Sequence, residues 1–230
     1  MSRVVDSRRL TGPHLLGDHP GAALDVAFDS SEPDPVAAVT AWRAEARRLL
    51  DAVGWSGEDI AARTFPGGAS LVITAPIDGL YAATDVNEAA WDAAMARSAG
   101  GPVDDTAPER LRAAIVRDHD TRLRALRDAA RARQVTFLAD DELVSAGTGR
   151  GAIVWPRHDL PAVPAVDWDE VHDVPIVLVT GSNGKTTSVR LIAAIVTAAG
   201  LVPGVTSTDG VRVAGDSLAG GDFAGPMGAR

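Results

Sequence analysis

The residues with the clearest chemical potential lie in the segment 181–187, which reads G-S-N-G-K-T-T. Backbone N–H groups at the start of a helix bind polyanions, and Gly181 and Gly184 would let the backbone approach phosphate oxygens closely. Lys185 is placed to neutralise terminal phosphates, and the Thr186 hydroxyl is placed to ligate Mg²⁺. The segment therefore predicts the phosphate-binding loop of a nucleotide site. Its spacing, G-x-x-G-K-T, is shorter than the common G-x-x-x-x-G-K-[ST] pattern, and an ordinary glycine-rich turn is the alternative.

The distribution of basic residues supports the same interpretation. The chain has 22 lysines and arginines, and Lys185 is the only lysine among them. A lysine carries a compact charge on a flexible stem, whereas an arginine presents a planar fork. The single lysine thus stands where a point charge is needed on phosphates, and chance within an arginine-rich composition is the competing explanation.

The elements that would position this loop can be predicted from the flanking residues. Residues 176–179 predict a buried strand, and the apolar helix after the loop is expected to end at Gly200. Residues 201–205 then predict a second, parallel strand, joined to the first by a right-handed crossover. This order places residues 206–210 near the phosphate end of the sheet, and residues 211–219 predict a hairpin.

The N-terminal part predicts a mixture of strands and amphipathic helices. Asp34 is expected to cap a helix over 35–53, and Thr106 with Glu109 forms a capping-box pattern that opens a long helix over 107–133. The eight arginines of that helix suggest either a docking face for an acidic partner or a solvated surface. The other expected helix covers 79–97, and the expected strands cover 3–5, 22–28, 69–74, 135–138, 143–145 and 152–155.

These elements predict an α/β chain of two domains. Residues 1–155 are expected to form an N-terminal α+β domain. Residues 156–174, rich in proline and acidic residues, are expected to be a linker. Residues 175–230 are expected to begin a phosphate-loop domain built on a parallel sheet.

Composition narrows the possible functions. Of 230 residues, 46% are hydrophobic and 23% are charged, which is typical of a globular chain. The net charge of −9 argues against nucleic acid and anionic membranes as partners. The absence of cysteine excludes disulfides and cysteine-based zinc sites. The charged N-terminus does not resemble a secretion signal, and with a nucleotide site we expect a cytoplasmic location.

From Val177 onward the sequence resembles the ATP-binding central domain of the Mur ligase family. The family loop T-G-T-N-G-K-T-T is matched by residues 180–187, with Ser182 replacing a threonine. The later family segments T-S-T-D-G and G-D-x-[ST]-G-P-x-[SG]-A-R are similar to residues 206–210 and 221–230. Within that family, the N-terminal part also resembles the cyanophycin synthetase branch, through S-R-R-L-T-G-P at residues 7–13.

The resemblance implies an ATP-dependent acid–amino acid ligase that works through an acyl phosphate and uses ATP and Mg²⁺. It implies carboxylate and amine substrates, among them an amino acid or a peptide polymer. Lys185 and Thr186 are expected to be catalytic, Thr186 and Asp209 are expected to ligate the metal, and Asp222 is a weaker candidate. The expected nucleotide-binding residues are Gly181, Ser182, Asn183, Gly184, Lys185, Thr186 and Thr187.

The Mur ligases contain further parts that these residues do not match. Their C-terminal domain and a later acidic Mg²⁺ ligand have no counterpart, so we expect the N-terminal portion of a longer enzyme, inactive as this chain alone. A non-catalytic nucleotide-binding or substrate-tethering module is the alternative. An ordinary phosphate-loop phosphotransferase fits the short loop less well.

Overall fold

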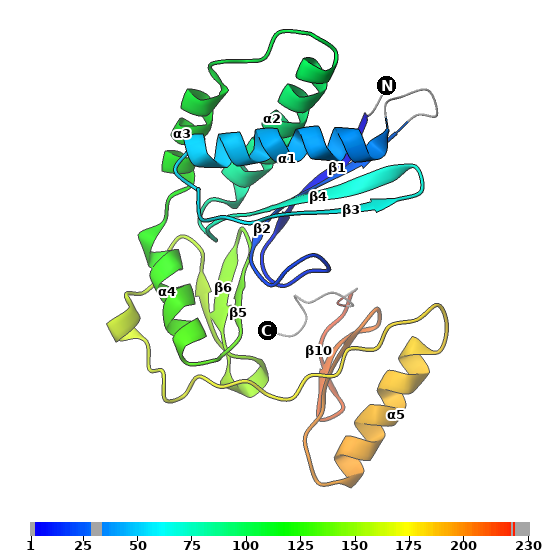
Figure 1. Cartoon of the computed structure of the whole chain (residues 1–230). Helices are drawn as coiled ribbons and strands as arrows, with labels where there is room; N and C mark the ends of the chain where they lie inside the picture. Colours follow the sequence, from blue (N-terminus) through cyan, green and yellow to red (C-terminus); the bar gives the residue numbers. More distant parts are fainter. Residues whose placement is uncertain (1–2, 29–33, 222, 224–230) are drawn as a thin grey trace. The chain divides into compact units, whose positions relative to one another are not determined.

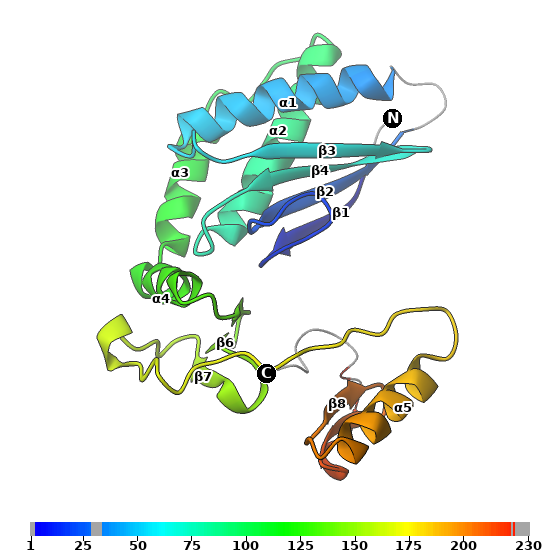
Figure 2. The same cartoon turned by 60° about the horizontal axis from the view of Figure 1, so that its bottom comes forward.

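The computed structural model describes residues 3–28, 34–221 and 223, which form two compact units, Met1–Leu126 and Arg127–Arg230. The first unit is a two-layer structure, in which one antiparallel sheet carries helices α1 and α2 on a single face (Figures 1 and 2). The order of the strands across this sheet is β1-β2-β4-β3. Its elements are β1 (Arg3–Leu10), β2 (Gly21–Ala27), α1 (Pro35–Ala52), β3 (Ile60–Phe65), β4 (Gly68–Thr74), α2 (Leu80–Ser98) and α3 (Ala107–Asp118).

The core of the first unit lies between the sheet and its two helices. Alternate residues of β2 and β4 point to this side and are fully buried, among them Leu24, Leu71 and Ile73. Asn87 of α2 ties the layers together: its Oδ1 accepts the Trp42 indole N–H at 3.0 Å. Its Nδ2 donates to the carbonyl oxygens of β2 and β4 at 3.2 and 3.1 Å. A buried amide is therefore satisfied by three separate elements.

Several predicted elements of this unit are confirmed, and the start of α1 is explained by its predicted cap. The Asp34 side chain accepts the Val36 N–H at 3.0 Å, so the predicted cap of α1 is present. Strand β3 was not predicted, because its sequence I-A-A-R-T-F has neither an apolar run nor a clear alternation.

The prediction of one helix over 107–133 is wrong, because the chain breaks into α3 and α4 (Thr121–Ala132). Asp120 begins the new helix by accepting the Arg122 and Leu123 N–H groups at 2.9 and 3.0 Å. Asp118 turns away and accepts the N–H of Ala82 at 2.8 Å, near the start of α2. The capping box is also absent, since Thr106 donates to Asp104 instead.

The second unit contains two small sheets, each of three antiparallel strands. The first has the order β5-β6-β7, and the chain then passes through a segment without long elements to helix α5. Helix α5 lies beside the second sheet, whose order is β10-β9-β8 (Figures 1 and 2). The elements are β5 (Phe137–Ala139), β6 (Leu143–Ala146), β7 (Ile153–Pro156), α5 (Lys185–Ala198), β8 (Gly204–Ser207), β9 (Gly210–Val213) and β10 (Asp216–Ala219).

The predicted parallel sheet around the phosphate loop is wrong. Within the described part of the chain, residues 175–184 form neither strand nor helix, and β8 pairs antiparallel with β9. A parallel strand needs neighbours along its edges and cover on both faces. Here Ile176, Val177 and Leu178 are 51, 67 and 88% exposed, so neither condition is met. The fold is mixed α+β, and every sheet in the described residues is antiparallel rather than of the predicted α/β kind.

No helix in the described ranges combines the length and apolarity needed to cross a membrane.

Candidate phosphate-binding site

The turn before α5 contains two glycines with positive φ, Gly181 and Gly184. Gly184 immediately precedes the helix in the left-handed conformation, with φ 78° and ψ −2°. A side chain is disfavoured at such a φ, although no described atom lies within 4 Å of the position that a Cβ would occupy. Glycine is therefore required at this position by the backbone conformation rather than by lack of space. Because no described atom crowds the position, the start of the helix is open.

The first turn of α5 supplies backbone donors. The Ser188 N–H donates to the Gly184 carbonyl oxygen at 2.9 Å, which is the first regular bond of the helix. The N–H groups of Lys185, Thr186 and Thr187 precede it and have no acceptor within the helix. Three adjacent donors at the positive end of a 14-residue helix can bind phosphate oxygens.

Lys185 closes over this loop. Its Nζ donates to the carbonyl oxygen of Gly181, four residues earlier. The side chain is exposed, as are Ser182, Asn183 and Thr187, while Thr186 is half-buried. The ammonium group is thus held at the mouth of the loop by one carbonyl oxygen, which a phosphate oxygen of higher charge can replace.

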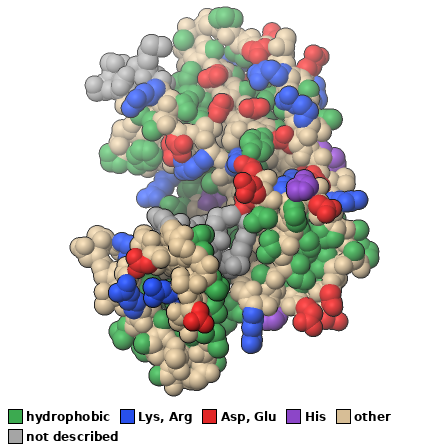
Figure 3. Space-filling view, turned by 180° about the vertical axis from the view of Figure 1, so that it is seen from behind, with side chains coloured by type: hydrophobic (Ala, Val, Ile, Leu, Met, Phe, Trp, Pro, Cys, Tyr) green, Lys and Arg blue, Asp and Glu red, His purple; other side chains and the backbone are tan. Residues whose placement is uncertain are grey.

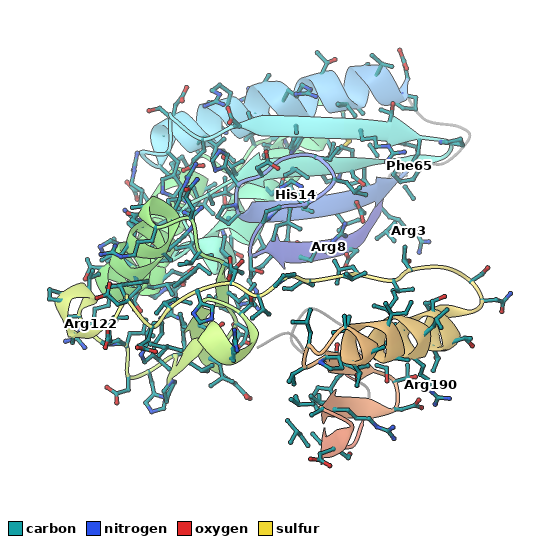
Figure 4. All side chains as sticks on the ribbon, turned by 90° about the horizontal axis from the view of Figure 1, so that it is seen from below. Arg3, Arg8, His14, Phe65, Arg122 and Arg190 are labelled. Atoms are coloured by element: carbon teal, nitrogen blue, oxygen red, sulfur yellow. The ribbon has the colours of Figure 1, made fainter. Side chains whose placement is uncertain are left out.

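Asp209 is brought to the same helix by an arginine that no sequence motif singled out. Arg190 Nη2 donates to Asp209 Oδ2 at 3.2 Å, and Figure 4 shows Arg190 extending from α5. Arg190 follows Thr186 by four residues, so the two side chains share one face of the helix. The spacing to Thr186 alone does not single out Arg190 in the sequence, because its partner Asp209 lies 19 residues away.

The residues present fit Mg²⁺ bound largely by phosphates and water. The Thr186 hydroxyl and the Asp209 carboxylate are both hard oxygen donors, which Mg²⁺ prefers. Among the described residues there is no group of three or more histidine, cysteine or acidic side chains that could hold a metal without a nucleotide. Asp222, the weaker candidate, lies outside the described residues.

Three of the eight arginines of residues 107–133 make contacts within the chain that do not depend on an acidic partner. Arg112 Nε donates to the Ala52 carbonyl oxygen at 2.9 Å, and Arg124 Nη2 pairs with the buried Asp78 at 2.7 Å. Arg133 stacks over the Trp168 ring with its guanidinium carbon 4.6 Å from the ring centre. On the face in Figure 3, basic and acidic side chains are interspersed over the first unit. These contacts favour the interpretation of a solvated, internally paired surface.

Comparison with known proteins finds local similarity to cyanophycin synthetases. The chain is 41% identical over 93 residues to the cyanophycin synthetase of Geminocystis herdmanii, a match covering 37% of this chain and 11% of that protein. It is 52% identical over 56 residues to the enzyme of Crocosphaera subtropica, covering 24% of this chain and 6% of that protein. It is 38% identical over 93 residues to that of Synechocystis sp., covering 37% and 11%. No family model matches the chain.

The matched residues therefore span about a tenth or less of these curated relatives. The predicted resemblance to cyanophycin synthetase is confirmed as a local similarity over 56 to 93 residues. What the comparisons establish is that the chain is locally similar to cyanophycin synthetases.

Proposed function

We propose that this chain forms the phosphate-binding part of an ATP-dependent ligase that joins a carboxylate to an amine. The observation that carries the proposal is the open start of α5, where left-handed Gly184 is followed at once by Lys185 and Thr186. The local similarity to cyanophycin synthetases supports the ligase class. An amino acid or a peptide polymer is the substrate class that their name suggests.

The proposed reaction has two steps. A carboxylate oxygen of the acyl substrate attacks the γ-phosphorus of ATP, so that an acyl phosphate forms and ADP leaves. The amine nitrogen then attacks the acyl carbon, the amide bond forms, and inorganic phosphate leaves with the loss of one amine proton. Phosphoryl transfer of this kind depends mainly on positioning and on neutralising negative charge.

The residues of the loop have separate parts in this proposal. The N–H groups of Lys185, Thr186 and Thr187 would hold phosphate oxygens, with Gly181, Ser182 and Asn183 forming the wall of the loop. Lys185 would exchange its bond to the Gly181 carbonyl for the β- and γ-phosphate oxygens. Thr186 and Asp209 would hold Mg²⁺, which, when bound, neutralises charge on the phosphates.

Nucleotide binding and acyl phosphate formation test the proposal separately. Calorimetry with AMP, ADP and ATP should show ATP and ADP binding at least about tenfold more tightly than AMP, because the loop would contact only the β- and γ-phosphates. Hydroxylamine traps an acyl phosphate as a hydroxamate, so ATP-dependent hydroxamate formation with candidate carboxylates tests the ligase step. Binding without trapping, on this chain and on one that includes the remaining parts of the relatives, would favour a non-catalytic nucleotide-binding module. No difference between AMP and ATP would contradict the site itself.

A further inference from the structure

We propose that Arg190 is a positioning residue of this site, which holds the Asp209 carboxylate in line with the Thr186 hydroxyl. The inference rests on the proposed nucleotide site. Arg190 donates to Oδ2 of Asp209, and we assign the other carboxylate oxygen, Oδ1, to the cation side. The ligand is a divalent cation carried by the phosphates.

The turn that carries Asp209 is held by contacts within the sheet of β8, β9 and β10. The Asp209 N–H donates to Ser207 Oγ at 3.1 Å, which holds the backbone of the turn. Gly210 has φ 121°, and a Cβ at this position would lie 2.2 Å from the Ala219 carbonyl oxygen of β10. The backbone of the turn therefore packs closely against β10, and the Asp209 side chain is contacted by Arg190 from α5.

The spacing of Thr186 and Arg190 along α5 brings the two side chains near each other. Thr186 and Arg190 are four residues apart, so they lie on one face and just over one turn, roughly 6 Å, apart along α5. An arginine side chain can span that distance, so this spacing allows the carboxylate that Arg190 holds to lie near the Thr186 hydroxyl. A hydrated Mg²⁺, which keeps several waters, can be shared by two donors arranged in this way.

The exposure of the Arg190–Asp209 pair indicates that it orients the Asp209 carboxylate rather than stabilising the fold. The side chains of Arg190 and Asp209 are 71% and 50% exposed. Exposed ion pairs add little to the free energy of unfolding, because water screens their attraction. A pair that contributes little to folding but fixes one carboxylate beside a phosphate loop should affect metal-dependent binding more than stability.

Calorimetry of the full chain tests this with ATP in excess Mg²⁺ and with ATP in EDTA. Arg190→Ala should weaken binding in Mg²⁺ by about three- to tenfold, the range expected for losing one oriented carboxylate contact, and should change binding in EDTA by less than about twofold. Arg190→Lys, which keeps the charge, should recover part of the loss. Arg212→Ala is the matched control, since it removes one exposed positive charge from β9 and should leave the Mg²⁺ dependence unchanged.

A double-mutant cycle with Asp209→Asn identifies the partner. If Arg190 acts through Asp209, Arg190→Ala should have no further effect in the Asp209→Asn background. Equal losses in Mg²⁺ and in EDTA, or additive losses in the double variant, would overturn the inference. If the wild type binds ATP equally tightly in Mg²⁺ and in EDTA, the inference about Arg190 is overturned, but the assignment of the phosphate loop stands. If the wild type binds no ATP at all, the proposed function fails, and the inference fails with it.

Discussion

Thr148 and Asp173 are joined by a hydrogen bond of 3.2 Å from the Thr148 hydroxyl to Asp173 Oδ1. The same hydroxyl accepts the Val174 N–H at 2.9 Å. Thr136 donates its N–H and its hydroxyl to the other oxygen of Asp173, both at 2.9 Å. The glycine-rich turn between the antiparallel strands β6 and β7 therefore also fixes the chain at residues 172–174.

This fixed point predicts where proteases cut. Residues 175–183 lie between Val174 and α5, form no regular structure and expose apolar side chains, so limited digestion with thermolysin should cleave there first. Mass spectrometry of the early fragments should show ends between residues 175 and 183. Thr148→Val, which removes the hydroxyl but keeps the volume, should add cuts at 166–174. First cleavage of the wild-type chain before residue 172 would contradict the role of this contact.

The buried amide of Asn87 should be important for the stability of the first unit. Asn87→Ala leaves the Trp42 indole N–H without its acceptor and opens a cavity, and we expect a loss of about 2–3 kcal/mol in the free energy of unfolding. Urea unfolding followed by Trp fluorescence measures the change. Thr84→Ala on the same helix is the control, with an expected loss below about 1 kcal/mol. Similar losses for the two variants would show that Asn87 is not a central contact.

Acidic residues on α2 predict a pH dependence. Burial first, and then the nearby Glu88 carboxylate, raises the pKa of Asp92 above its usual value. The folded state thus holds this proton more tightly than the unfolded chain does, so this contribution to stability falls as pH rises through the raised pKa. Asp92→Asn should therefore raise the unfolding free energy at pH 7 by on the order of 0.3 kcal/mol, reduced by salt.

The pH control for Asp92→Asn is the same comparison at pH 3. Both states of the wild type are largely protonated there, so the variant and the wild type should have nearly equal Tm values if Asp92 is responsible. A gain that persists unchanged at pH 3 would assign the effect to packing rather than to charge.

The sequence predicted those elements whose signals are local. The Asp34 cap, the helix that follows it and the strand over 22–28 depend on neighbouring residues, and the structure confirms them. The break between α3 and α4 could not be seen in the apolar period, because Leu111, Leu123 and Leu126 keep a helical spacing across it. Asp118 and Asp120 cause the break through hydrogen bonds, one of them to a distant helix.

At the phosphate loop, too, the sequence predicted local features but not those that depend on distant residues. The order of glycine, lysine and threonine predicted a turn followed by a helix, which a local motif can do, and the helix begins at Lys185. Whether residues 176–179 become a strand depends on neighbouring strands, and their apolar composition carries no information about those neighbours. Arg190 was missed because its partner Asp209 lies 19 residues away, and the spacing to Thr186 gains meaning only once that partner is known.

The most direct test of the central claim is the affinity of the chain for ATP in Mg²⁺, measured by calorimetry for the wild type and Lys185→Ala. We predict that Lys185→Ala lowers the affinity by at least about 30-fold, since one phosphate-bound ammonium group contributes about 2 kcal/mol. Lys185→Arg should recover only part of the loss, because the planar fork does not follow the path of the lysine stem. Arg212→Ala should retain affinity within about twofold of the wild type, as expected for an exposed charge outside the loop. Equal affinity of the wild type and Lys185→Ala would contradict the assignment of a phosphate-binding site.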